Sequence, residues 1–178
     1  MPPDPHPAST PKLGKGMLYV AWLLALGLLT WGFSGWLGKM RNPNQHPVSM
    51  AHNDAQEVRL LRNRYGHYNA SGRINGQTVE FMLDTGATAV AVPAGLASRL
   101  GLANGPAMDI QTANGRVTAY ATRLDSLQLG GIEMRDVRAV ISPSMDGDEI
   151  LLGMSVLKHL DFNQQGDTLT LRQRSSNQ

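Results

Sequence analysis

An alternating apolar segment that ends in an acidic residue constrains this chain more than any other feature. Apolar and polar side chains alternate over residues 77–83, which predicts a half-buried strand, and Asp84 follows it directly. The chain then reads Asp84, Thr85, Gly86, Ala87 and Thr88. Gly86 permits a tight turn, and the two threonine hydroxyls are able to hold the loop by hydrogen bonds. A carboxylate fixed at the end of a buried strand is suited to activating a water molecule.

The rest of the chain beyond residue 57 has the pattern of an all-β domain with short helices. Asn75-Gly76 and Asn114-Gly115 are pairs that typically close two-residue hairpins. Strands are predicted over residues 65–73, 77–83, 90–92, 108–112, 116–123, 124–129, 137–141, 150–152 and 169–171. Short helices are predicted over residues 93–100, where Pro93 suits a first turn, and over residues 154–160.

The N-terminal part of the chain differs in composition, because it contains a long apolar segment. Residues 16–38 contain no charged side chain, and Lys15 and Lys39 flank them. As a helix, these 23 residues would rise about 34 Å, enough to cross a hydrocarbon layer of about 30 Å. The alternative is a cleaved signal peptide, but the apolar stretch is long for one and no Ala-x-Ala site follows it. We therefore expect a single transmembrane helix.

These patterns divide the chain into five parts. Residues 1–15 are rich in Pro, Ser and Thr and are predicted to be a disordered tail, and residues 39–56 are predicted to be a polar linker. The folded domain is expected over residues 57–173, with a short tail at 174–178. Basic residues flank both ends of the apolar segment, so charge alone does not set its orientation in a membrane.

Composition argues against several other functions. The formal net charge is +2, and no basic stripe with interleaved aromatic residues is present, so we expect no nucleic-acid partner. The five histidines do not have metal-ligand spacing beside clustered carboxylates, so we expect neither a metal nor a cofactor. Ser155 lies in a Gly-Met-Ser-Val-Leu segment that lacks the second glycine of a nucleophile elbow. We interpret it as a residue at a helix start.

Several motifs together resemble one known family. The Asp84–Thr88 loop, the apolar segment 90–92 and the later run Ile150-Leu151-Leu152-Gly153 resemble the retropepsin-like, or retroviral-type, aspartic proteases over about residues 58–172. The resemblance is greatest to the bacterial, membrane-anchored branch of that clan. It implies a retropepsin-like acid-protease β-barrel and an aspartic endopeptidase activity.

The resemblance also assigns roles to residues. Asp84 would be catalytic, with Thr85, Gly86, Ala87 and Thr88 as its active-site loop. The hairpin Thr112, Ala113, Asn114 and Gly115 would be the flap that closes over substrate, and Ile150–Gly153 would pack beneath the catalytic loop. Met154-Ser155 follows Gly153 where the retroviral pattern has Arg with Asn or Asp, so a salt-bridge network built on that Arg is not expected.

The number of catalytic carboxylates predicts the assembly. Peptide hydrolysis by carboxylates alone requires two of them, one to accept a proton from water and one to donate a proton to the carbonyl oxygen. The chain has one Asp-Thr-Gly, because Asp167-Thr168 continues into Leu169. We therefore expect a homodimer in which each subunit contributes Asp84 at a two-fold axis.

The short N-terminal tail and large C-terminal domain, together with the resemblance, favour a single-pass protein of the bacterial inner membrane with its protease domain in the periplasm. Its substrate would be a protein or peptide segment. One alternative is a non-catalytic peptide-binding or assembly module on the same β fold. Another is a tethered structural domain in which Asp84 only caps a turn. The intact Asp-Thr-Gly favours the protease.

Overall fold

The structure is a computed structural model that describes residues 13–52, 55–112 and 115–174 of the 178-residue chain. The chain divides into two units, residues 1–38 and 39–178. Helix α1 (Leu13–Arg41) begins in the first unit and ends in the second. Its segment Lys15–Gly38 has a mean hydropathy of 1.7 and is long and apolar enough to cross a membrane. Of the predicted tails at residues 1–15 and 174–178, residues 1–12 and 175–178 lie outside the described residues, whereas residues 13–15 belong to α1 and Arg174 ends the last strand.

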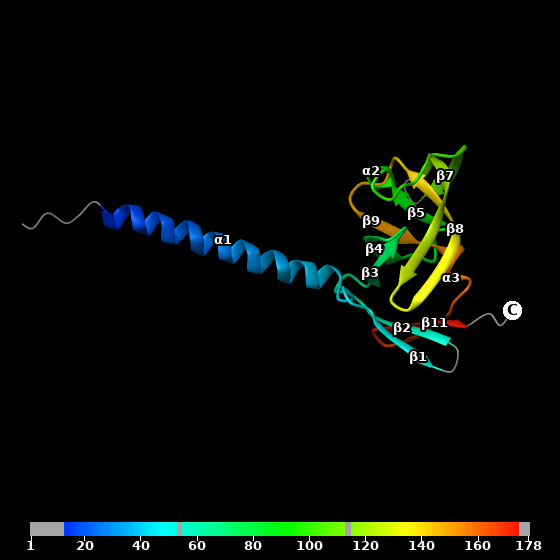
Figure 1. The fold of residues 1–178 in the computed structure, drawn as a ribbon, viewed down its shortest axis with the longest axis horizontal. Helices are drawn as coiled ribbons and strands as arrows, with labels where there is room; N and C mark the ends of the chain where they lie inside the picture. Colours follow the sequence, from blue (N-terminus) through cyan, green and yellow to red (C-terminus); the bar gives the residue numbers. More distant parts are fainter. Residues whose placement is uncertain (1–12, 53–54, 113–114, 175–178) are drawn as a thin grey trace, which may run out of the picture. The chain divides into compact units, whose positions relative to one another are not determined.

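The second unit is built almost entirely of strands (Figure 1). Its strands are β1 (Val48–His52), β2 (Ala55–Leu61), β3 (Asn69–Ile74), β4 (Gln77–Leu83), β5 (Val90–Pro93), β6 (Ala107–Thr112), β7 (Gly115–Leu129), β8 (Ile132–Ser142), β9 (Glu149–Leu152), β10 (Asp161–Gln165) and β11 (Thr168–Arg174). Two short helices interrupt them, α2 (Ala94–Ala97) and α3 (Met154–Leu157). The expected all-β class is confirmed.

Seven strands form the larger sheet, in the order β3-β4-β9-β5-β8-β7-β6. Two of its pairings are parallel, β4 with β9 and β5 with β8, and β3 also pairs with β7 through Arg73–Gln128 and Ile74–Leu127. This extra pairing joins strands at opposite parts of the sheet order, so the sheet closes on itself as a barrel, and β6 pairs with β7 at the end of the order.

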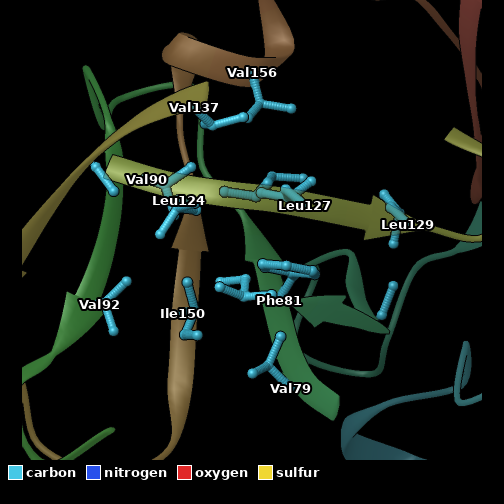
Figure 2. Close-up of a cluster of buried hydrophobic side chains, with 14 of the residues drawn as sticks. Val79, Phe81, Val90, Val92, Leu124, Leu127, Leu129, Val137, Ile150 and Val156 are labelled. Atoms are coloured by element: carbon cyan, nitrogen blue, oxygen red, sulfur yellow. The ribbon is translucent and has the colours of Figure 1, made fainter. Parts of the chain in front are cut away.

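The barrel closes around one large core, and a smaller buried cluster is formed by Ala91, Ala119 and Val140. Figure 2 shows side chains from β4, β5, β7, β8, β9 and α3 converging, among them Phe81, Leu124, Leu127, Ile150 and Val156. Phe81 and Ile150 are fully buried on neighbouring parallel strands, where they are direct Cα partners. Because Phe81 lies three residues before Asp84, the same core that stabilises the barrel also fixes the strand that carries the carboxylate.

A smaller sheet joins the two ends of the domain in the order β1-β2-β11-β10. Strand β2 pairs antiparallel with β11 along its whole length, from Ala55–Arg174 to Leu61–Thr168. Val58, Leu60 and Leu171 of these strands are buried and belong to the main core. The N-terminal and C-terminal strands of one chain are therefore already hydrogen-bonded to each other.

The structure revises several predicted boundaries. The helices predicted over 93–100 and 154–160 are single turns at Ala94–Ala97 and Met154–Leu157. The strand predicted from residue 65 begins at Asn69, because residues 62–67 form a turn. The strands predicted over 116–123 and 124–129 are one continuous strand, β7, in which Asp125 has no paired residue on β8. The register of β7 on β8 is the same on both sides of this position, with Leu124 opposite Val137 and Ser126 opposite Arg135.

The segment 39–56 differs from the predicted linker. It contains β1 and the first residues of β2, and the compact unit begins at Lys39. Asn42 and Asn44 are buried, and Asn44 pairs with Ala70 in an isolated parallel bridge. The Asn42 amide donates to the Ser71 hydroxyl at 3.1 Å. This part of the chain is folded into the domain.

Asn44 makes the largest share of these contacts. Its amide nitrogen donates to the carbonyl oxygens of Leu61 (2.9 Å) and Asn69 (2.7 Å), and its side-chain oxygen accepts from the Leu61 N–H (2.7 Å). The Asn44 side chain thus hydrogen-bonds the backbone at the end of β2 and at the start of β3, as a strand between them would. Buried backbone groups of this kind are costly to leave without partners.

Replacing Asn44 with Ala should therefore destabilise the domain. We expect the free energy of unfolding to fall by about 2–3 kcal/mol, because backbone groups of Leu61 and Asn69 lose their partners. Pulse proteolysis of the full chain in urea measures this, since all three tryptophans lie in α1 and do not report on the domain. The control is Asn163→Ala on the exposed strand β10, and equal stability of the two variants would contradict the prediction.

Candidate active site

Asp84 lies at the carboxyl end of β4, where the backbone is held from both sides. The Leu83 N–H donates to the carbonyl oxygen of Tyr68 at 3.0 Å, and the Asp84 N–H donates to that of Leu152 at 3.2 Å. The first contact joins β4 to the residue before β3, and the second joins it to the end of β9. The Asp84 residue itself is half-buried, so its carboxylate reaches a surface while its backbone is fixed.

The loop after Asp84 turns around the carboxylate. The Gly86 N–H donates to Oδ1 of Asp84 at 2.8 Å, and the Ala87 N–H donates to the backbone carbonyl oxygen of Asp84 at 3.3 Å. A side chain that accepts from the backbone two residues later is a common way for Asp to organise a turn. A Cβ atom at position 86 would lie 3.2 Å from Oδ1, tighter than most contacts, so glycine suits this close approach.

The two threonines of the loop do not act as the sequence suggested. Thr85 and Thr88 are exposed, and within the described part of the chain neither hydroxyl makes a hydrogen bond. The loop is instead held by backbone N–H groups and by the strand beneath it. The hydroxyls of Thr85 and Thr88 are thus free to meet groups from outside this chain.

The Ile150–Gly153 segment lies directly under the loop. Ile150 and Leu152 are buried, and the Met154 N–H donates to the carbonyl oxygen of Ala87 at 2.8 Å. A Cβ atom added at Gly153 would meet the carbonyl oxygens of Ala87, at 2.6 Å, and of Ala89. Only a residue without a side chain allows the loop to rest this closely on the end of β9.

Ser155 takes part in the same support. Its Oγ accepts from the Val90 N–H at 3.1 Å and donates to the carbonyl oxygen of Arg138 at 2.9 Å. These bonds connect α3 with β5 and β8, the two strands that run parallel beside the loop. The sequence predicted a helix-start residue here, and Ser155 is the second residue of α3. Its hydroxyl has a structural function at the position where the retroviral pattern differs.

The predicted flap lies at the tip of the β6–β7 hairpin. Thr112 pairs with Gly115, whose positive φ of 112° suits a tight turn, while Ala113 and Asn114 lie outside the described residues. Most of β6 is exposed, including Met108. The hairpin therefore projects from the barrel, as a segment that covers a bound peptide would.

Among the described residues, no group of three or more His, Asp or Glu side chains is placed to hold a metal ion. The chain has no cysteine.

Comparison with known proteins identifies this arrangement. Residues 70–159, just over half of the chain, match the family described as gag-polyprotein putative aspartyl protease. The matched region contains the Asp84 loop, the β6–β7 hairpin and Gly153. The chain belongs to this family of retropepsin-like aspartic proteases.

Three individual proteins are similar to this chain. The crystal structure of a retropepsin-like aspartic protease from Rickettsia conorii matches with a TM-score of 0.55 and 27% identity, covering 71% of this chain and 94% of that one. EIAV protease in complex with the inhibitor HBY-793 matches with a TM-score of 0.45 and 20% identity, covering 56% and 92%. An uncharacterized protein from the 5′ region of cobV in a Sinorhizobium species is 33% identical over 123 residues. That match covers 66% of this chain, which spans about half the length of the Sinorhizobium protein.

The close packing at Gly153 gives a prediction. Gly153→Ala should displace the Asp84 loop and lower the free energy of unfolding by about 1–3 kcal/mol, because the new methyl group overlaps two carbonyl oxygens. Gly95→Ala in α2 is the matched control, since a methyl group there meets no atom within 4 Å. Pulse proteolysis gives the stability, and amide hydrogen exchange at Met154 reports on the loop contact. Unchanged exchange in Gly153→Ala would show that the loop does not rest on this residue.

Proposed function

We propose that the chain is a membrane-anchored aspartic endopeptidase whose active form is a homodimer. The observation that carries this proposal is the position of Asp84, whose backbone is fixed by β9 and whose carboxylate is turned toward a surface by the Gly86 N–H. Membership in the aspartic protease family supports the reaction. The single Asp-Thr-Gly in the sequence supports a second subunit as the source of the second carboxylate.

In this proposal, the Asp84 side chains of two subunits share one proton. Two carboxylates about 3 Å apart cannot both ionise easily, so the pair titrates as a unit. The ionised carboxylate accepts a proton from the attacking water, and the protonated one donates to the oxygen of the scissile carbonyl. The exposed hydroxyls of Thr85 and Thr88 are available for contacts across the two-fold axis. The β6–β7 hairpin would close over the peptide and exclude bulk water.

The same proposal places the chain in a bacterial inner membrane, with residues 16–38 as a single span and the protease domain in the periplasm. The length and hydropathy of Lys15–Gly38 support the span. The Rickettsia and Sinorhizobium relatives support the bacterial assignment. Substrates would be protein or peptide segments, and neither a metal, a cofactor nor a nucleic acid takes part.

Cleavage of a diverse peptide library tests the activity. We expect the full chain to cleave peptides, Asp84→Asn to lose at least about a hundredfold in rate, and an active-site aspartic-protease inhibitor to block the wild type. Asp125→Asn, an exposed aspartate on β7, should keep full activity. If a demonstrated dimer of the wild type cleaves nothing, the non-catalytic peptide-binding module becomes the better interpretation.

Mixing experiments test the shared site. When an equal amount of Asp84→Asn chain is co-reconstituted with a fixed amount of wild type, random pairing leaves about half of the wild-type chains in wild-type dimers. Activity should therefore fall to about half. A control with Asp125→Asn in place of Asp84→Asn should leave the activity unreduced. Activity that is insensitive to added Asp84→Asn chain would indicate that one chain carries a complete site.

The alanine at position 87 leads to a prediction for the pH range of the proteolytic activity. A hydroxyl at position 87 could donate to the carboxylate and favour its ionised form, whereas Ala cannot. We expect activity from acidic to near-neutral pH, and Ala87→Ser should move the acidic limb of the rate profile to lower pH. Rates measured from pH 3 to 8 for both chains check this. A wild-type profile confined below pH of about 4, where ordinary carboxyl groups titrate, would contradict the expectation.

A further inference from the structure

A turn of the protease domain packs directly against the end of helix α1. Residues 62–67 connect β2 to β3, and the buried side chain of Asn63 organises them. Its Oδ1 accepts from the N–H groups of Tyr65 (2.9 Å) and His67 (3.0 Å). Its amide donates to the carbonyl oxygen of Arg41 at 3.0 Å, which ties the turn to the last residue of α1.

The outward side chains of this turn are basic or aromatic. Arg64, Tyr65 and His67 are exposed, and Tyr65 keeps 59% of its surface accessible. The Arg64 guanidinium lies 5.2 Å from the centre of the Tyr65 ring, and its Nη1 is 3.3 Å from Sδ of Met40. Arg41 is also exposed. We refer to Arg41, Arg64, Tyr65 and His67 as the juxtamembrane surface.

Chain connectivity determines how far this surface can lie from the membrane. The candidate span ends at Gly38, and α1 continues to Arg41. Three further helical residues add about 4.5 Å along the axis. The headgroup layer on each side of a bilayer is about 5–7 Å thick. Met40 and Arg41 therefore fall within that layer, whichever side of the membrane the domain occupies, and the turn that contacts them begins there.

We propose that the juxtamembrane surface binds the phosphate groups of phospholipids and holds this face of the domain on the bilayer. This inference rests on the membrane insertion that is part of the proposed function. Arginines donate well to phosphate oxygens, and tyrosine prefers the membrane interface. Arg41, Tyr65 and His67 of this surface also line a pocket that contains four carboxylates, those of Glu80, Asp146, Asp148 and Glu149. Binding therefore depends on lipid phosphate at the interface more than on a net negative membrane charge.

This contact would bring the candidate catalytic loop to the membrane surface. Tyr68 follows the turn, and its carbonyl oxygen accepts from the N–H of Leu83, the residue before Asp84. Asp84 then lies on the order of 10 Å from the turn, the length of about three residues. In a homodimer with both chains in one bilayer, the two-fold axis is normal to the membrane, and both surfaces contact the same leaflet. The substrates within easiest reach are chain segments close to the bilayer.

Site-directed labelling of the full chain in phospholipid nanodiscs tests the proposal. The chain has no cysteine, so single-cysteine variants take one nitroxide label each. His67→Cys places a label on the surface while it leaves Arg41, Arg64 and Tyr65 intact. Asp125→Cys is the reference position. Its neighbour Ser126 accepts a hydrogen bond from the Asn75 N–H, and Asn75 follows the end of β3 that is far from the turn. Six strand residues separate the two ends by about 20 Å. Leu24→Cys reports on the helix itself.

We expect the accessibility of the label at position 67 to a water-soluble relaxation agent to be at least about threefold lower than that of the label at position 125. Adding Arg64→Glu and Tyr65→Ser to His67→Cys should restore that accessibility, whereas adding Arg135→Glu, at an exposed arginine on β8, should not. Neutral and anionic nanodiscs should give similar results. If label 24 is in the hydrocarbon but label 67 is as accessible as label 125, the surface does not bind the bilayer and the proposal fails. If label 24 is itself exposed to water, the membrane anchor fails first.

Discussion

The contact between the Asp84 loop and the end of β9 is the constraint on which the rest of the site depends. Two backbone hydrogen bonds, from Asp84 to Leu152 and from Met154 to Ala87, hold the loop on a glycine that leaves no room for a side chain. β9 is itself fixed because Ile150 and Leu152 are fully buried in the barrel core. The stability of the core and the position of the carboxylate are therefore one property of the fold.

A second constraint joins the two ends of the domain. Strand β2 is paired with β11, and the buried Asn44 fills the gap between the end of β2 and the start of β3. These contacts make the described residues 39–52 and 55–61 part of the compact domain unit, and the Asn63 side chain hydrogen-bonds the carbonyl oxygen of Arg41 within it.

The sequence predicted the fold class and the strand that leads into Asp84, because both depend on local patterns. Alternation over residues 77–83 and the glycine-containing loop after Asp84 are direct consequences of residue type and order. The sequence did not predict a strand that forms only because a neighbouring strand pairs with it. Strand β10 is exposed at every position and polar except for Phe162, and it forms by pairing with the edge of β11. β7 was predicted as two strands, and its unbroken register on β8 makes it one continuous strand.

Residue types therefore determined, by themselves, an apolar segment long enough to cross a membrane, an all-β domain and a single Asp-Thr-Gly. The tertiary structure decided what local patterns cannot encode. It brought Gly153 under the loop, gave Ser155 a bridging position between β5 and β8, and folded the expected linker into the domain. These contacts join residues that are far apart in the chain, and only the closed barrel brings their backbone groups within hydrogen-bonding distance.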